Sequence, residues 1–321
     1  MKIASKFLLA SFIIGGGLIS HLSAQNFTEE EVVFKSGDNV LSGTLVLPTL
    51  AENVPILIFM GGMYEWGDFH SQREVFIREN LVTVFPRAGV GVFYYDPRGT
   101  GDSDGRWGRA SIPDLAEDAI AAIRFLTQRK EIDPNRIGII GHGEDGWAAQ
   151  IVAATEPQQV KLMASIAGPT INPEQQLINE YHSDYVCNGQ DSASAYQKAE
   201  QKALSHQNWV SVLPLTKSWR HMKMKQGFDP SPYLKNIAIP ALFVFGENDG
   251  DVYPSWSIQR LNEIYPDSLP KNFRVHTIAG ANHFFYVTNP CFDEYEKSGN
   301  LNLNFSFRFK EVFQNWIFEN L

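Results

Sequence analysis

One stretch of this sequence indicates the fold of the chain. It reads Ile137-Gly138-Ile139-Ile140-Gly141-His142-Gly143-Glu144-Asp145-Gly146. Its first four residues form a short apolar run that is typical of a buried strand, and residues 147–154 after it have helical character. A strand, a sharp turn and a helix are the context of a nucleophile elbow, which holds its central residue in a strained conformation above the sheet. Gly141 fills the first small position of that motif, Gly143 its centre and Asp145 its second small position.

Further apolar runs on both sides of this stretch predict a sheet. Runs at 54–59 and 89–95 are continuous rather than alternating, which indicates strands buried on both faces, as in parallel sheets. Residues 162–166, 241–245 and 273–278 also fit strands. Residues 31–35 and 40–47 predict two strands joined by a turn at Ser36-Gly37-Asp38-Asn39. Residues 112–129 and 307–320 have helical periodicity. This alternation predicts an α/β domain with a mostly parallel central sheet flanked by helices.

The pattern changes between the two halves of this predicted core. Residues 169–236 are rich in Gln, Asn, Lys and aromatic residues and are too long for a plain loop. We therefore expect a helical insertion there, with the core formed by residues 25–168 and 237–321. Because the insertion enters at the carboxyl edge of the sheet, we expect it to cap a pocket. A helical insert without a lid role is the alternative.

The first 24 residues predict an export signal. Lys2 and Lys6 precede an apolar run at 7–20, and Ala24 offers a small residue for cleavage. The run is shorter than the ~20 residues of a membrane span, although an uncleaved anchor stays open because Leu22 fits the cleavage pattern poorly. Cleavage after Ala24 removes 24 of 321 residues and two lysines, which leaves 297 residues and changes the formal charge from −9 to −11. We expect a periplasmic or secreted protein with no membrane span after cleavage.

Composition narrows the functional classes. With 44% hydrophobic and 20% charged residues, the chain is an ordinary folded protein rather than a disordered one. An acidic chain without a basic tract repels phosphates, so we expect no nucleic-acid partner. The two cysteines, Cys187 and Cys291, predict either a disulfide in an oxidising compartment or two isolated thiols, and without a His cluster they predict no zinc site.

Two more polar residues follow predicted strands. Asp249 comes just after the strand at 241–245, and His283 comes after the strand at 273–278. An acid or a histidine in a loop is weak evidence alone. The order elbow, acid, histidine is the order of a hydrolase triad in an α/β sheet, and sites in such sheets lie beyond the carboxyl ends of the strands.

With these residues, the chain resembles the α/β-hydrolase family, in particular its exported bacterial esterase and serine-peptidase-like branch. The resemblance covers most of the mature chain. It rests on residues 95–103 (Tyr-Asp-Pro-Arg-Gly-Thr-Gly-Asp-Ser), 114–118, 132–138, 167–169 and 228–230. It implies that Asp249 is the triad acid and His283 the triad base. It also implies that the backbone N–H groups of Glu144 and of Gly62, or of Met63, would bind an oxyanion.

The departures from the family pattern decide the functional hypotheses. Gly143 stands at the nucleophile position and has no side chain, Met60-Gly61 replaces a usual His-Gly, and Asp145 stands where Gly is expected. We therefore expect a pseudo-hydrolase that binds an ester-like or peptide-like small molecule. The alternatives are an active ester or amide hydrolase that uses water activated by His283 or a carboxylate such as Glu144, and an interaction protein that uses the aromatic insert. Without a complete dinucleotide fingerprint or metal-ligand spacing, we expect no cofactor and no metal.

Overall fold

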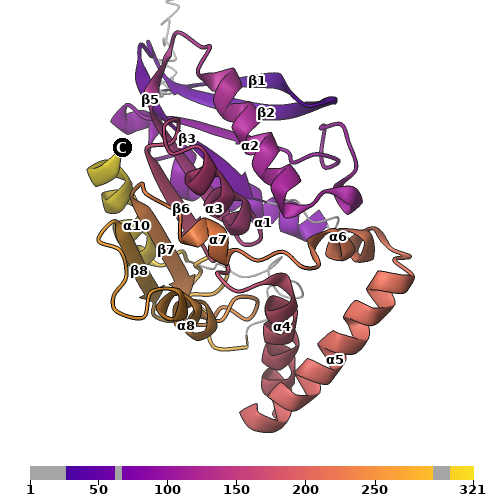
Figure 1. Cartoon of the computed structure of the whole chain (residues 1–321). Helices are drawn as coiled ribbons and strands as arrows, with labels where there is room; N and C mark the ends of the chain where they lie inside the picture. The colour runs from indigo at the N-terminus through magenta and orange to yellow at the C-terminus, as the bar shows by residue number, and fades with distance from the viewer. Residues whose placement is uncertain (1–26, 62–66, 292–303) are drawn as a thin grey trace, which may run out of the picture.

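The computed structural model describes residues 27–61, 67–291 and 304–321 (Figure 1). Eight strands form one sheet in the order β1-β2-β4-β3-β5-β6-β7-β8. The β1/β2 and β2/β4 pairs are antiparallel, and all other neighbours are parallel. The predicted mostly parallel sheet is therefore confirmed. Its strands are β1 (Phe27–Ser36), β2 (Asn39–Pro48), β3 (Val54–Gly61), β4 (Gly91–Tyr95), β5 (Ile132–His142), β6 (Leu162–Ile166), β7 (Ala241–Gly246) and β8 (Phe273–Ile278).

The strands follow the apolar runs of the sequence closely, with one extension. Every residue of β4, β6 and β7 is buried, as expected for strands covered on both faces. Strand β5 begins at Ile132, earlier than the run at 137–140 predicts, because the polar residues 133–136 continue in extended conformation beside β3. The pairing with β3 shifts register between Val54 and Ile56 at that place.

Helices cover both faces of the sheet (Figure 1). On one face, α2 (Ile112–Leu126), α3 (Asp145–Thr155) and α8 (Pro254–Ile264) pack on an aliphatic cluster. On the other face, α1 (Gly67–Ile77), a π-helical turn (Arg78–Val82) and α10 (Phe307–Asn320) pack on a cluster rich in phenylalanine. This two-sided cover fixes the carboxyl ends of the strands, where the site lies.

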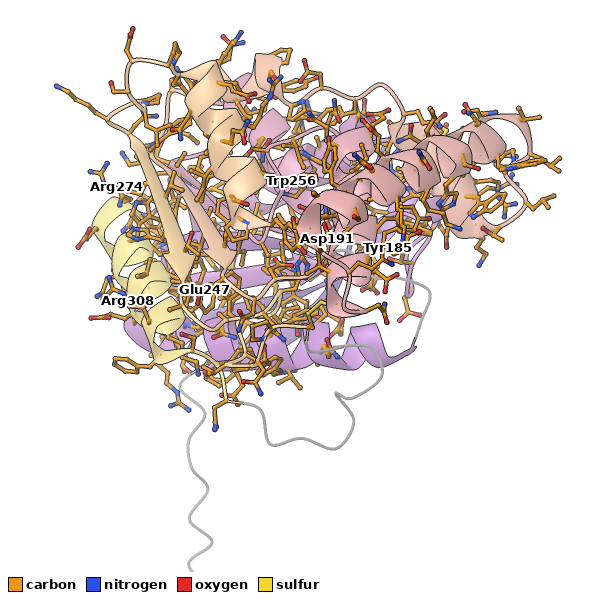
Figure 2. The ribbon with its side chains drawn as sticks, turned by 90° about the horizontal axis from the view of Figure 1, so that it is seen from below. Tyr185, Asp191, Glu247, Trp256, Arg274 and Arg308 are labelled. Carbon is orange, nitrogen blue, oxygen red and sulfur yellow. A yellow bond between two sulfur atoms is a disulfide. The ribbon has the colours of Figure 1, made fainter. Side chains whose placement is uncertain are left out.

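Four helices follow β6 before the chain returns to β7. They are α4 (Pro173–Cys187), α5 (Ser192–Val212), α6 (Lys217–Lys225) and α7 (Ser231–Leu234). Helices α4 and α5 form a hairpin that extends beyond the sheet (Figures 1 and 2). Near the turn that joins these two helices, Trp256 of α8 packs against the His182 and Tyr196 rings at 5.8 Å each. The division into core and cap, and a lid role for these helices, stay predictions.

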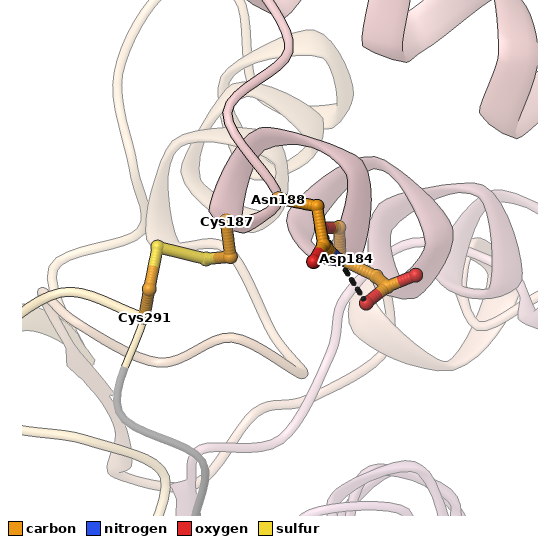
Figure 3. The surroundings of a disulfide bond; sticks show 4 residues. All are labelled: Asp184, Cys187, Asn188 and Cys291. Carbon is orange, nitrogen blue, oxygen red and sulfur yellow. Dashed lines mark hydrogen bonds between the residues drawn. A yellow bond between two sulfur atoms is a disulfide. The ribbon is translucent and has the colours of Figure 1, made fainter.

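Cys187 and Cys291 form a disulfide (Figure 3), which decides between the two alternatives for these residues. The bond joins the last residue of α4 to the segment after β8, across 104 positions of sequence. Next to it, Asn188 Nδ2 donates a hydrogen bond to Asp184 Oδ1 at 3.0 Å. The helical insertion is thereby tied covalently to the loop region that carries His283.

The predicted signal segment, residues 1–24, lies outside the described residues. None of the helices within the described ranges is long and apolar enough to cross a membrane.

Candidate functional site

The turn between β5 and α3 has the geometry that its sequence predicts. Gly143 has φ +56°, in the left-handed region where side chains are strained. Its N–H donates to Ile166 O at 3.0 Å, and its carbonyl accepts from Gly146 N at 2.9 Å. A Cβ on Gly141 would lie 2.2 Å from Asp145 O, so only glycine fits there. A second close approach, 2.7 Å between a Cβ on Gly146 and Gly168 Cα, lies one residue later than expected, since we placed the second small position at Asp145.

Gly143, Asp249 and His283 come together at this turn. His283 Nδ1 donates to Asp249 Oδ2 at 2.9 Å, and both side chains are buried. Asp249 Oδ1 accepts from the N–H groups of Asp251 and Val252 at 2.9 and 2.8 Å, which fixes the carboxylate. A Cβ built on Gly143 would lie 3.1 Å from His283 Nε2 and would meet nothing else but the same ring within 4 Å. The dyad therefore faces the place where a side chain at position 143 would stand.

The His142 side chain contacts the backbone of His283, the histidine of this dyad. Its Nε2–H donates to His283 O at 3.0 Å, and the two rings lie 4.7 Å apart. Burial, reinforced by the neighbouring His283 charge, lowers the pKa of His142 to about 3. His142 is therefore a neutral donor at ordinary pH, and it orients the backbone that carries His283. Sequence reasoning placed His142 only as a residue between two glycines.

The site opens into a pocket of about 240 Å³. Its wall combines the elbow, the dyad and two helices of the insertion. The lining residues are Trp107, Gly143, Glu144, Trp147, Pro169, Pro173, Gln176, Leu177, Glu180, Ser218, His221, Met222, Lys225, Asp251, Val252 and His283. Because α4 and α6 supply eight of these sixteen residues, the insertion forms part of the pocket wall.

The Glu144 side chain does not point to the dyad but pairs with two cations of α6. One oxygen contacts His221 Nε2 and the other contacts Lys225 Nζ. His221 Nδ1 also lies 3.0 Å from Ala110 O, so both ring nitrogens face acceptors. Burial favours the neutral acid, but the charges of His221 and Lys225 hold the pKa of Glu144 well below its ordinary value. This cluster locks α6 onto the elbow, and sequence reasoning missed His221 and Lys225.

A buried arginine fixes the neighbouring strand ends. Arg73 of α1 donates from Nε to Gly61 O and from Nη2 to Tyr95 O, both at 2.8 Å. Burial lowers the pKa of Arg73, and the carboxylates of Asp96 and Asp145 oppose that shift. Asp145, the unexpected residue of the elbow, therefore supplies charge that this buried cation requires. No local pattern in the sequence pointed to Arg73.

The candidate oxyanion donors are described only in part. Gly62 and Met63 lie outside the described residues. Glu144 directly precedes α3, whose first N–H groups have no acceptor within the helix, so its backbone is placed where an oxyanion donor would stand. Met60 and Gly61, the departures from the family pattern before Gly62, are the last two residues of β3.

Asp249, Asp251 and His283 are the one group in the described residues whose donor atoms, all within 4.8 Å, could hold a metal ion. Asp249 already accepts from His283 and from two backbone N–H groups. A metal would have to replace these bonds, so the donor set fits an acid–base dyad better than a cation.

A peptidase family model and two thiohydrolases match parts of this sequence. The X-Pro dipeptidyl-peptidase (S15 family) model matches residues 37–189, somewhat less than half of the chain. Thiohydrolase aneE of Aspergillus aculeatus is 33% identical over 141 residues, and thiohydrolase apmlB of Arthrinium phaeospermum is 37% identical over 84 residues. These matches cover 43% and 26% of this chain and 41% and 27% of the two relatives, so the chain spans well under half of their lengths.

Solved structures resemble the whole chain. The Pyrococcus furiosus esterase Pf2001 superposes with a TM-score of 0.60 and 15% identity, over 98% of this chain and 99% of that one. Est1E from Butyrivibrio proteoclasticus gives a TM-score of 0.58 and 16% identity, over 90% and 98%, and a second structure of Est1E holds ferulic acid. The chain therefore has the α/β-hydrolase fold, and together with the S15-family match these likenesses support the α/β-hydrolase family.

Proposed function

We propose that this protein is an exported pseudo-hydrolase that binds an ester-like or peptide-like small molecule and lacks serine catalysis. The observation that carries the proposal is Gly143, which stands beside His283 Nε2 without a side chain. A serine triad forms its covalent intermediate on the serine oxygen, so no acyl-enzyme can form at Gly143. The Cys187–Cys291 disulfide supports export, because such bonds persist mainly in oxidising compartments.

The pocket supports a ligand of modest size. A volume of about 240 Å³, with Trp107, Trp147 and Leu177 beside the charged groups, is below that of pockets for drug-sized ligands. Apolar walls suit an acyl or aryl group, and the N–H side of the elbow suits a carbonyl oxygen. The ferulic acid in one Est1E structure is a compound of this class, which supports small-molecule binding here.

Hydrolysis by water is the second candidate function, and the intact dyad favours it. His283 Nε2 lies 3.1 Å from the place where a Cβ at position 143 would stand, and Nδ1 is held by Asp249. In this route Nε2 takes a proton from water, and the hydroxide oxygen adds to the acyl carbon. The bond to the leaving sulfur or oxygen then breaks, and the imidazolium returns its proton to the leaving group. A thioester suits this route best, since a thiolate leaves easily, and two relatives are named thiohydrolases.

A carboxylate nucleophile is the less favoured version of this second candidate. Both Glu144 oxygens are occupied by His221 and Lys225. Attack by Glu144 would require breaking a buried ion pair, which costs several kcal/mol, on the order of 3–5.

Turnover and binding measured together distinguish the candidates. Wild type and His283→Ala are assayed with a p-nitrophenyl ester and an acyl thioester, and binding of ferulic acid is measured by calorimetry. The pseudo-hydrolase proposal predicts that both proteins stay at the background rate while wild type binds the acid. Turnover by wild type that His283→Ala abolishes would establish the water route instead. Absence of both turnover and binding would contradict both candidates.

A further inference from the structure

The connection between α5 and α6 lies on a projecting edge of the molecule (Figure 1). Apolar side chains in and beside this connection are exposed. Six of the thirteen large hydrophobic residues that are exposed in the described ranges fall within a span of 21 residues: Leu204, Trp209, Val212, Leu213, Leu215 and Met224. Val212 is 78% exposed, Leu215 67% and Trp209 59%. Clustered exposed apolar residues of this kind mark interaction surfaces, whereas single ones are ordinary.

The helix pattern explains why these residues face solvent. In the first half of α5, Ala195, Ala199 and Ala203 are buried against α4. In the second half, only Val210 is buried, because the helix continues past the end of its partner. The exposed apolar residues beyond Ala203 are not part of the hydrophobic clusters that form the core of the described residues.

The same edge is positively charged in an acidic protein. Residues 201–228 contain five Lys or Arg, of which Lys225 pairs with Glu144 in the pocket wall, and no Asp or Glu, whereas the whole chain has a net charge of −9. Arg220 donates to Leu215 O at 3.0 Å and Lys223 donates to Ser211 O at 2.7 Å. These contacts place both cations at the apolar connection. Because their partners in these contacts are backbone carbonyls rather than carboxylates, the contacts do not neutralise the positive charges. Lys217 lies at the start of α6, and Arg109 lies next to Gly108, which approaches Lys217 O.

We propose that the α5–α6 edge, defined as Trp209, Val212, Leu213, Leu215, Lys217, Arg220 and Lys223, binds the surface of an anionic lipid bilayer. Aliphatic and indole side chains beside cations are the composition of segments that lie in the membrane interface. Each basic residue near an anionic membrane surface adds about fivefold in affinity. A second copy of the chain fits less well, because a two-fold contact would bring identical cations together.

Vesicle co-sedimentation tests this proposal. The full chain is mixed with phosphatidylcholine vesicles that contain or lack phosphatidylglycerol. We expect binding to the anionic vesicles, weaker binding at higher salt, and little binding to phosphatidylcholine alone. Val212→Ser with Leu215→Ser is expected to weaken binding about tenfold or more, and Lys217→Gln with Lys223→Gln by a similar factor.

Matched controls come from α10, near the C-terminus and away from the α5–α6 edge. Phe307 is 80% exposed and Arg308 is 63% exposed on α10, so Phe307→Ser and Arg308→Gln change equally exposed groups elsewhere. They are expected to bind like wild type, and circular dichroism checks that every variant is folded. Failure of wild type to bind anionic vesicles would overturn the proposal. It would also be overturned if the control variants lost as much binding as the variants of the α5–α6 edge. Concentration-dependent dimerisation that Val212→Ser abolishes would show that a second copy occupies this edge instead.

Discussion

Gly143 combines a strained backbone with an absent side chain. Its φ of +56° is the conformation of a nucleophile elbow, and glycine adopts it without the ~1–2 kcal/mol that another residue would lose. The space beside it is bounded by His283 and is open otherwise. Position 143 therefore lacks the hydroxymethyl group of a serine, and Met60 and Asp145 are further departures from the family pattern, while Asp249 and His283 lie together beside the turn.

Much of this arrangement could be predicted from single residues and their order. The turn at Gly143 and the convergence with Asp249 and His283 followed from strand ends, since the carboxyl ends of parallel strands meet at one edge. The Glu144 contacts with His221 and Lys225 could not be predicted, because they depend on how the insertion folds over the elbow. The roles of Asp249, His283 and the oxyanion donors stay predictions.

His142 makes a pH-dependent contribution to stability. Its pKa is lowered to about 3 in the folded protein from an ordinary value near 6.5, so the unfolded state binds the extra proton between these values. Stability is therefore expected to fall as pH drops below about 6.5, by roughly 3 kcal/mol at about pH 4 from this group.

Urea unfolding of wild type and His142→Gln at a series of pH values measures this contribution. The variant keeps a side-chain donor for His283 O but cannot be protonated. Its stability should fall less steeply with acid than that of wild type. Identical slopes for the two proteins would contradict a buried neutral His142.

At the scale of elements, a buried ion pair fastens the loop after β4 to α2. Arg98 Nε and Nη2 donate to Asp118 at 2.9 and 2.7 Å, and Asp118 is fully buried. Arg98 Nη1 also donates to Asp114 at 2.8 Å, and Asp114 completes the capping box of α2 with Ser111. The loop of residues 95–103, part of the family resemblance, is held to the core by these contacts.

Asp118→Ala is expected to lower the free energy of unfolding by about 3–5 kcal/mol, because it leaves a mostly buried guanidinium without its main partner. Glu117→Ala is the matched control, since Glu117 is 71% exposed and lies 3.8 Å from Arg98. The control should change stability by less than about 1 kcal/mol. Chemical unfolding of both variants measures the difference. Equal losses in the free energy of unfolding would show that the buried Arg98–Asp118 pair contributes no more to stability than the exposed Glu117.

The strands were easier to predict than the helices. Continuous apolar runs mark β3, β4, β6, β7 and most of β5, because both faces of these strands are buried. Helices α1 and α8 were not predicted. Only Ser257 and Leu261 of α8 are buried, and the sequence of α1 is polar over most of its length, so neither has a strong apolar stripe.

At the scale of the whole molecule, the disulfide joins the insertion to the core. The spacing of Cys187 and Cys291 left pairing open, because sequence separation does not give distance in space. Their bond closes a loop with a separation of 104 residues, which restricts the unfolded chain strongly.

Cys187→Ser with Cys291→Ser is expected to destabilise the protein by about 4–5 kcal/mol in the chain-entropy model. Thermal unfolding of the double variant should show a clearly lower Tm than wild type, and wild type in reductant should approach the variant. An unchanged Tm in both experiments would indicate that the insertion is held fully by non-covalent contacts.

The central claim is that the missing side chain at Gly143 is what prevents serine-hydrolase chemistry at this site. The most direct measurement is the rate of p-nitrophenyl ester hydrolysis by wild type, Gly143→Ser and Gly143→Ser with His283→Ala. We predict a background rate for wild type, a gain of about 10²-fold or more in Gly143→Ser, and loss of that gain in the double variant. A folded Gly143→Ser protein without any gain, or wild-type turnover that already depends on His283, would contradict the claim.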